Sequence, residues 1–210
     1  MNKYLWGLMT LLALGVAGYA LSLLFFADLE NHSFLAHHFK THAWALYGHL
    51  GLGSGALVVG ALQFLKQIRI KRPAIHRWIG RLYVIFCITS GFSGLALALS
   101  SEQTAASFGF IALAAFWIVT TSLGFLKAYS RDFIHHREWM IRSYALTYAA
   151  VALRFILPVE LMLGIEFSTA YIIVSWACWV PNLIAAEWII KHTPHPKPTA
   201  VQKNETVQKL

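Results

Sequence analysis

Two histidine-arginine pairs, His76-Arg77 and His136-Arg137, each stand at the start of a long apolar segment. An imidazole can ligate haem iron or another metal, and it can exchange a proton near neutral pH. Ionisable residues at the ends of membrane helices are rarely there for packing alone. The two pairs therefore predict a haem, metal or proton site near one end of a helical bundle.

The helical period separates the candidate ligand from its neighbour. Residues three, four and seven positions apart share one face of a helix. His76 then shares a face with Tyr83, and His136 shares a face with Arg154. His135 points about 100° away from His136, because each residue turns the helix by about that angle. We therefore expect His136, and not His135, to face the site.

The expected ligand of this site is one b-type haem. Such a haem needs two axial imidazoles at equal depth on facing helices, together with cations for its propionates. His76 and His136 fit this requirement, and the side chains expected around them are Arg77, Arg81, Arg142, Tyr83 and Gln63. A quinone is the alternative ligand. The competing interpretation is that both histidines only contact lipid phosphates at the membrane surface.

A second polar group, His49, Arg154 and Glu160, is expected near the opposite membrane face. An arginine deep in a bilayer must find an anion or an aqueous cavity. This group predicts a second site, either for a quinone or for a proton-coupled transporter centred on Arg154 and His49. A broken helix would favour transport, and Pro158 is the position that suggests a break. A third alternative is an accessory subunit without chemistry of its own.

Composition indicates that membrane helices position these residues. Of the 210 residues, 58% are hydrophobic and 12% are charged, and the mean hydropathy is +0.57. Six apolar segments approach the ~20 residues that a membrane-spanning helix needs. All must be helices, because lipid offers the backbone no hydrogen-bond partner. They cover residues 4–26, 44–65, 78–100, 107–128, 139–163 and 168–190.

The resulting prediction is an all-α integral membrane bundle of six transmembrane helices over residues 1–191, followed by a disordered basic cytoplasmic tail over residues 192–210. The first apolar segment resembles a signal peptide, but it continues through Phe26, so we expect a retained helix. Cys87 and Cys178 fall inside the expected spans and predict no disulfide. His38 and His42 have the one-turn spacing of two metal ligands, although isolated loop histidines are more often solvated.

Charge predicts the orientation. Lys and Arg gather after the second and fourth segments and in the tail, whereas Asp28, Glu30, Glu102 and Glu166 lie in the other connections. The positive-inside rule then places both termini in the cytoplasm, with the protein in the cell (inner) membrane. This topology and anionic lipid explain the formal net charge of +8. We expect the lipid bilayer as a partner and no nucleic acid, with a homo-oligomer or a larger membrane complex left open.

A family resemblance rests on three ordered motifs. They are Gly-Ala-Leu-Gln-Phe at 60–64, the run from Arg72 to Tyr83, and His-Arg-Glu-Trp-Met-Ile-Arg-Ser-Tyr at 136–144. With His49 before them and Arg154 after them, they resemble the bacterial integral-membrane family catalogued as domain of unknown function 2306, from about His49 to Glu187. The resemblance implies the membrane topology but no activity. The family-like positions are His49, Gln63, His76, Arg77, Gly80, Arg81, His136, Trp139, Arg142 and Arg154.

A fainter resemblance is to transmembrane b-type di-haem cytochromes, which also carry histidines on successive helices. This chain departs from their pattern because its fourth segment, 107–128, has no histidine. The departure argues against di-haem electron transfer across the membrane. His49 has no histidine at equal depth, so the residues support one haem better than two. Taken with the residues, the resemblance predicts a multi-pass membrane protein with a redox role.

Overall fold

The computed structural model describes residues 3–32 and 35–193, and within them the regular structure is entirely helical. All but the first two residues of the predicted tail lie outside this range. The helices of the described part are α1 (Lys3–Phe26), α2 (Ala36–Gln63), α3 (Lys66–Lys71), α4 (Pro73–Leu99), α5 (Thr104–Tyr129), α6 (Phe133–Thr147), α7 (Ala149–Met162), α8 (Phe167–Ala177) and α9 (Val180–His192).

Six helical segments are long and apolar enough to span a membrane, and this confirms the predicted fold class. They are α1, α2, α4, α5, the pair α6–α7 and the pair α8–α9. Most begin several residues before the predicted apolar core. Pro73 stands in the first turn of α4, where its missing N–H costs nothing. The Asp132 side chain accepts a hydrogen bond from the His135 N–H (3.3 Å) and so caps the start of α6.

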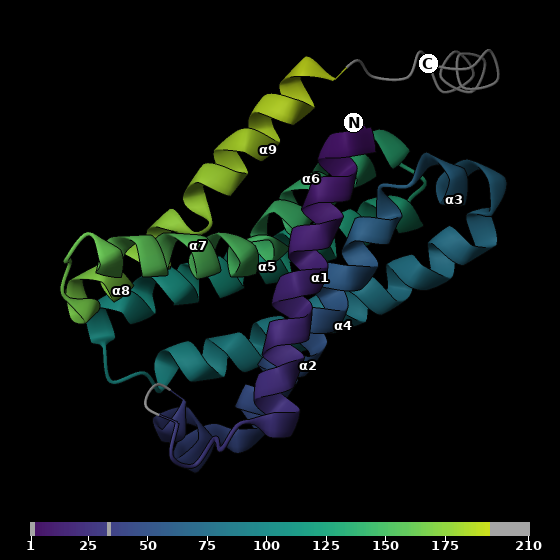
Figure 1. Ribbon diagram of the computed structural model, residues 1–210. Helices are drawn as coiled ribbons and strands as arrows, with labels where there is room; N and C mark the ends of the chain where they lie inside the picture. Colours follow the sequence, from purple (N-terminus) through teal and green to yellow (C-terminus); the bar gives the residue numbers. More distant parts are fainter. Residues whose placement is uncertain (1–2, 33–34, 194–210) are drawn as a thin grey trace, which may run out of the picture.

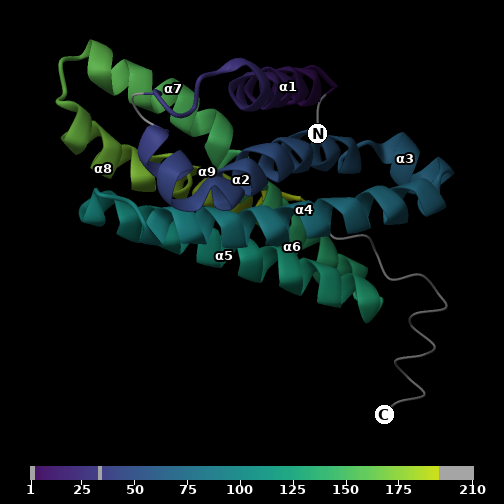
Figure 2. The same cartoon turned by 90° about the horizontal axis from the view of Figure 1, so that it is seen from below.

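The spans form layers (Figures 1 and 2). α2 packs between α1 and α4, and α5 packs against α4, α6 and α8. The core at the centre includes small residues and aromatic rings from several helices, among them Ala56, Tyr83, Trp117, Tyr144 and Trp179. Gly60 permits the close approach of two of these rings, because a Cβ there would lie 2.5 Å from Tyr144 and 2.7 Å from Tyr83.

The last two spans are interrupted in the middle. α6 ends at Thr147 and α7 begins at Ala149, and α8 ends at Ala177 before α9 begins at Val180. The break suggested at Pro158 is wrong, because α7 continues through that residue. Asn182 joins the two interruptions: its Nδ2 donates to the carbonyls of Ala145 (3.2 Å) and Cys178 (3.0 Å). Such side-chain partners are what a broken helix requires inside a membrane.

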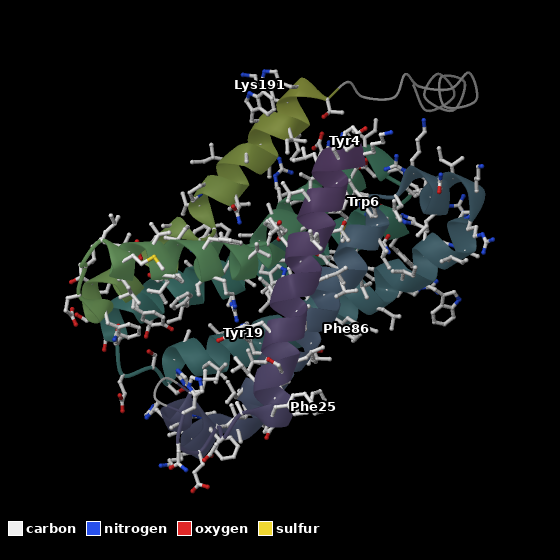
Figure 3. All side chains as sticks on the ribbon, in the orientation of Figure 1. Tyr4, Trp6, Tyr19, Phe25, Phe86 and Lys191 are labelled. Atoms are coloured by element: carbon white, nitrogen blue, oxygen red, sulfur yellow. The ribbon has the colours of Figure 1, made fainter. Side chains whose placement is uncertain are left out.

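The two ends of the bundle differ in charge. The start of α1, the helix α3 and the end of α9 lie toward one end (Figure 1), and Tyr4 and Lys191 are found there, while Phe25 lies toward the other (Figure 3). The basic connection around α3 belongs to the first end, and Asp28 belongs to the loop after α1 at the second. This separation of charge is the basis of the orientation, which stays a prediction.

Candidate functional site

A cavity of about 260 Å³ lies inside the bundle and is lined by residues of α1, α2, α4, α5, α6, α7 and α8. Most of its wall is Leu, Ala, Val and Gly. Its polar lining residues include His38, His49, Ser54, Ser101, Trp117, Thr147, Arg154 and Tyr171. An apolar pocket with a few convergent polar groups is the usual form of a small-molecule site, although volumes of ~300–1,000 Å³ are more typical.

His49 projects from α2 and is held against α4. Its Nδ1 lies 3.0 Å from the carbonyl oxygen of Ser90, and the Ser90 hydroxyl donates to the carbonyl of His49 (3.1 Å). Gly94 makes room for the ring, because a Cβ there would lie 2.8 Å from His49 Nδ1. A carbonyl only accepts, so Nδ1 carries the proton and the Nε2 of a neutral His49 is a hydrogen-bond acceptor.

Arg154 lines the same cavity from α7. Its Nη1 donates to the carbonyl of Ala150 (3.2 Å), and its guanidinium lies 5.9 Å from the centre of the Tyr19 ring. Tyr19 projects from α1 and is labelled in Figure 3. Within the described chain Arg154 has no salt bridge. A guanidinium has five N–H donors, so Arg154 can donate to a further acceptor in the cavity.

Of the predicted second group, the structure brings His49 and Arg154 together at the cavity, and the two interact electrostatically. Glu160 is not among the cavity-lining residues. It is buried, with 8% of its surface exposed, and its Oε2 has no hydrogen-bond partner among the described residues. Glu160 follows Arg154 by six positions, so along the unbroken α7 the two side chains point about 120° apart.

A buried hydroxyl network borders the cavity. Tyr83 OH lies 2.9 Å from both Ser143 Oγ and Thr147 Oγ1, and Thr121 Oγ1 lies 2.7 Å from Ser143 Oγ. Trp117 Nε1 donates to Thr147 Oγ1 (2.9 Å). Thr147 and Trp117 also line the cavity, and neither was singled out as a site residue from the sequence. In the sequence, the residue type and helical phase of Thr147 and Trp117 fit core packing as well as they fit a site. Only the contacts between helices show that the two residues belong to the hydroxyl network.

The first predicted site lies near the start of α4 and α6. His136 Nδ1 donates to the carbonyl of Gly124 (2.7 Å), which leaves its Nε2 as an acceptor. His76 interacts electrostatically with His136. The Nδ1 of His76 and the Nε2 of Gln63 are buried without a hydrogen-bond partner among the described residues. His76 and His136 therefore lie in one region of the molecule.

The expected companions of this site have different surroundings. Arg142 already has a carboxylate partner, because its Nε and Nη2 donate to Glu187 at 2.5 and 2.9 Å. Arg77 and Arg81 are exposed, and Arg81 lies 5.3 Å from the Trp78 ring centre. Tyr83 belongs to the hydroxyl network described above. Of the arginines predicted at this site, Arg77 and Arg81 thus have no salt bridge in the described chain.

The histidines at the other end form a separate cluster. His37 contacts Glu102 (Nδ1 to Oε1, 3.1 Å) and the carbonyl of Ser100 (Nε2 to O, 2.9 Å). His38 borders the cavity, and His42 has non-helical backbone angles inside α2 (φ −143°, ψ 54°). Across the described residues, no group of three or more His, Cys, Asp or Glu side chains is arranged to hold a metal ion.

The family described as "Predicted membrane protein (DUF2306)" matches residues 46–190. This range contains His49, His76, His136 and Arg154, but it excludes α1 and the histidines at the start of α2. No curated protein and no solved structure matches the chain. Because the match covers more than half of its length, the chain belongs to the DUF2306 family of membrane proteins.

Proposed function

We propose that the protein binds a lipophilic small molecule of the quinone–quinol class in the cavity between His49 and Arg154. One observation carries the proposal: an arginine with no carboxylate partner in the described chain and a histidine with a free acceptor nitrogen line one apolar cavity inside the bundle. Buried cations in membranes are costly unless they serve a ligand, an ion path or a partner.

The hydrogen-bonding roles of the two residues fit the two ends of such a head group. Arg154 has only donors and suits a carbonyl oxygen. The Nε2 of His49 is an acceptor and suits the hydroxyl of a quinol. The remaining wall is largely Leu, Ala and Gly, which suits a ring and an alkyl tail.

Ligand titration tests this proposal. The protein in lipid nanodiscs is titrated with decylubiquinone, and quenching of tryptophan fluorescence is followed, since Trp117 borders the cavity. We expect saturable quenching that weakens at least about tenfold in Arg154→Gln, because hydrogen bonds to charged groups contribute about 1.5–3 kcal/mol. Arg69→Gln is the matched control, because Arg69 is exposed on α3. Equal affinity in wild type and Arg154→Gln would contradict the proposal.

A second candidate function is binding of one b-type haem by His76 and His136. The observation that favours it is the bond from His136 Nδ1 to Gly124, which presents Nε2 as a ligand atom in the way that haem and metal ligands are oriented. The unpartnered polar atoms of His76 and Gln63 fit a bound group, and Arg77 and Arg81 could pair with propionates. A bound haem would supply one-electron redox chemistry.

An absorption spectrum tests this second candidate. Protein expressed with ample haem should show a Soret band and a reduced α-band, and His136→Ala should lose them. His135→Ala is the neighbouring control, because His135 instead contacts Asp132 (2.8 Å). Absence of these bands from the wild-type protein would exclude haem and leave the cavity proposal untouched.

A further inference from the structure

The segment from Lys66 to Arg81, here called the basic elbow, comprises α3, Arg72 and the first residues of α4. It carries six cations and no Asp or Glu. All six are exposed, and none forms a salt bridge within the described chain: Lys66, Arg69, Lys71, Arg72, Arg77 and Arg81. So many unpaired cations on sixteen residues repel one another unless an external anion neutralises them.

The basic elbow also exposes apolar side chains. Ile70 and Trp78 are 61% and 66% exposed, and α3 has no buried residue. In both ribbon views α3 lies at the edge of the molecule, where α2 ends and α4 begins (Figures 1 and 2). Cations and a tryptophan next to the end of a membrane span are typical of the headgroup region of a bilayer.

The basic connection between α5 and α6, at the same end of the bundle, differs from the basic elbow in one respect. Lys127 lies 3.2 Å from Asp132, and Asp132 also contacts His135. Its cations are therefore partly neutralised within the chain, whereas those of the basic elbow are not. This contrast shows that the elbow is more than a general excess of positive charge at one end of the molecule.

We propose that the basic elbow is a binding site for the headgroups of anionic phospholipids. Four of its six cations are arginines, whose guanidinium groups can bind a phosphate through two parallel hydrogen bonds. Trp78 and Ile70 would lie at the level of the headgroups and upper acyl chains, with Arg81 stacked on Trp78. The site thus distinguishes lipids by charge and holds them beside the start of α4.

Electron paramagnetic resonance of spin-labelled lipids tests this site on the full-length protein in phosphatidylcholine vesicles. We expect labelled phosphatidylglycerol to be immobilised in preference to labelled phosphatidylcholine. The preference should fall about tenfold in the variant R69Q/R72Q/R77Q/R81Q, because each interfacial cation adds to the attraction, and high salt should weaken it in the wild type.

The matched control is K127Q/R131Q/R137Q/K191Q, which removes four cations outside the basic elbow. We expect this control to keep most of the preference. Equal loss in both variants, or no loss in the elbow variant, would overturn the proposal. If the quadruple elbow variant does not fold, R69Q/R72Q on the exposed surface of the elbow gives the same comparison against K127Q/R131Q, with a smaller expected loss.

Discussion

His49 illustrates how one backbone contact decides the chemistry of a side chain. The Ser90 carbonyl fixes the proton on Nδ1, and Nε2 is then an acceptor for a ligand. In the sequence, Gly53 and Gly60 share a helical face with His49, but helical phase alone cannot tell which residue of a neighbouring helix the ring meets. For that reason the sequence does not predict which ring nitrogen of His49 carries the proton. It therefore does not predict which nitrogen can accept a hydrogen bond from a ligand.

Gly94→Ala should weaken decylubiquinone binding without removing any polar group from the cavity. The added Cβ would lie 2.8 Å from His49 Nδ1 and 2.9 Å from Cε1, so the ring must move away from Ser90. Overpacking of this kind costs about 1–3 kcal/mol. Fluorescence titration and thermal unfolding measure the two effects. Gly18→Ala is the control, because nothing lies within 4 Å of a Cβ there, and equal binding in both variants would argue against this role of Gly94.

Tyr83→Phe should destabilise the bundle by about 1–3 kcal/mol, because it removes two buried hydrogen bonds that contribute about 0.5–1.5 kcal/mol each. The Tyr83 hydroxyl contacts Ser143 and Thr147, and the residue is 1% exposed. Unfolding in a detergent titration measures the change. Tyr47→Phe removes the same group from a residue that is 44% exposed and should have little effect. A similar loss in both variants would mean that the network contributes little.

At the scale of helices, the sequence predicted the six spans well and their interruptions poorly. The length of an apolar segment predicts a span, because the thickness of the bilayer sets the length of a helix that crosses it. The interruption between α6 and α7 depends instead on Asn182, which comes from another span and donates to Ala145. Pro158 misled the prediction, since a proline is tolerated in α7 while the break lies elsewhere.

Asn182→Ala should loosen both interruptions, because it removes the donor to Ala145 and Cys178 together. Hydrogen exchange should then rise around the junctions of α6 with α7 and of α8 with α9. Asn31→Ala is the control, since the Asn31 side chain donates to Asp28 (2.8 Å) within the loop after α1. If exchange rises at neither junction, the Asn182 hydrogen bonds do not stabilise these junctions.

Broken helices beside a cavity also suit transport. Loss of uptake into proteoliposomes in Asn182→Ala would favour that alternative.

Asp132 gives a pH-dependent prediction for the start of α6. Hydrogen bonds from His135 and then Lys127 lower the pKa of Asp132 below its ordinary value of 3.8. A lowered pKa means that the carboxylate stabilises the folded state above the unfolded pKa, and that this stabilisation is lost as pH falls through the folded pKa. Asp132→Ala should therefore lower thermal stability near neutral pH, and the difference from wild type should shrink as pH falls below 3.8.

Thermal unfolding across this pH range measures the effect of Asp132. Glu30→Ala is the control, because Glu30 is an exposed carboxylate in the loop after α1 and caps no helix. A constant difference between wild type and Asp132→Ala from neutral to acid pH would show that the carboxylate charge is not responsible.

At the scale of the whole molecule, seven helical elements converge on one cavity, and together they represent all six spans of the described chain. The predicted haem region lies near the starts of α4 and α6, whereas the cavity lies beside the junctions within the last two spans. From the sequence alone, the region of His76 and His136 is the leading candidate site, because it contains both histidine-arginine motifs. The cavity is evident only from the packed helices, since its wall is mostly Leu, Ala and Gly, which are common in any membrane helix.

Photo-crosslinking with an azido-quinone tests the central claim most directly. Mass spectrometry of the labelled wild-type protein should find the label in peptides of α2 around His49 and of α7 around Arg154, and excess decylubiquinone should displace it. Arg154→Gln should lose most of this label, while Arg69→Gln should keep it. Labelling only around His76 and His136, or labelling that excess decylubiquinone does not reduce, would contradict a quinone site in the cavity.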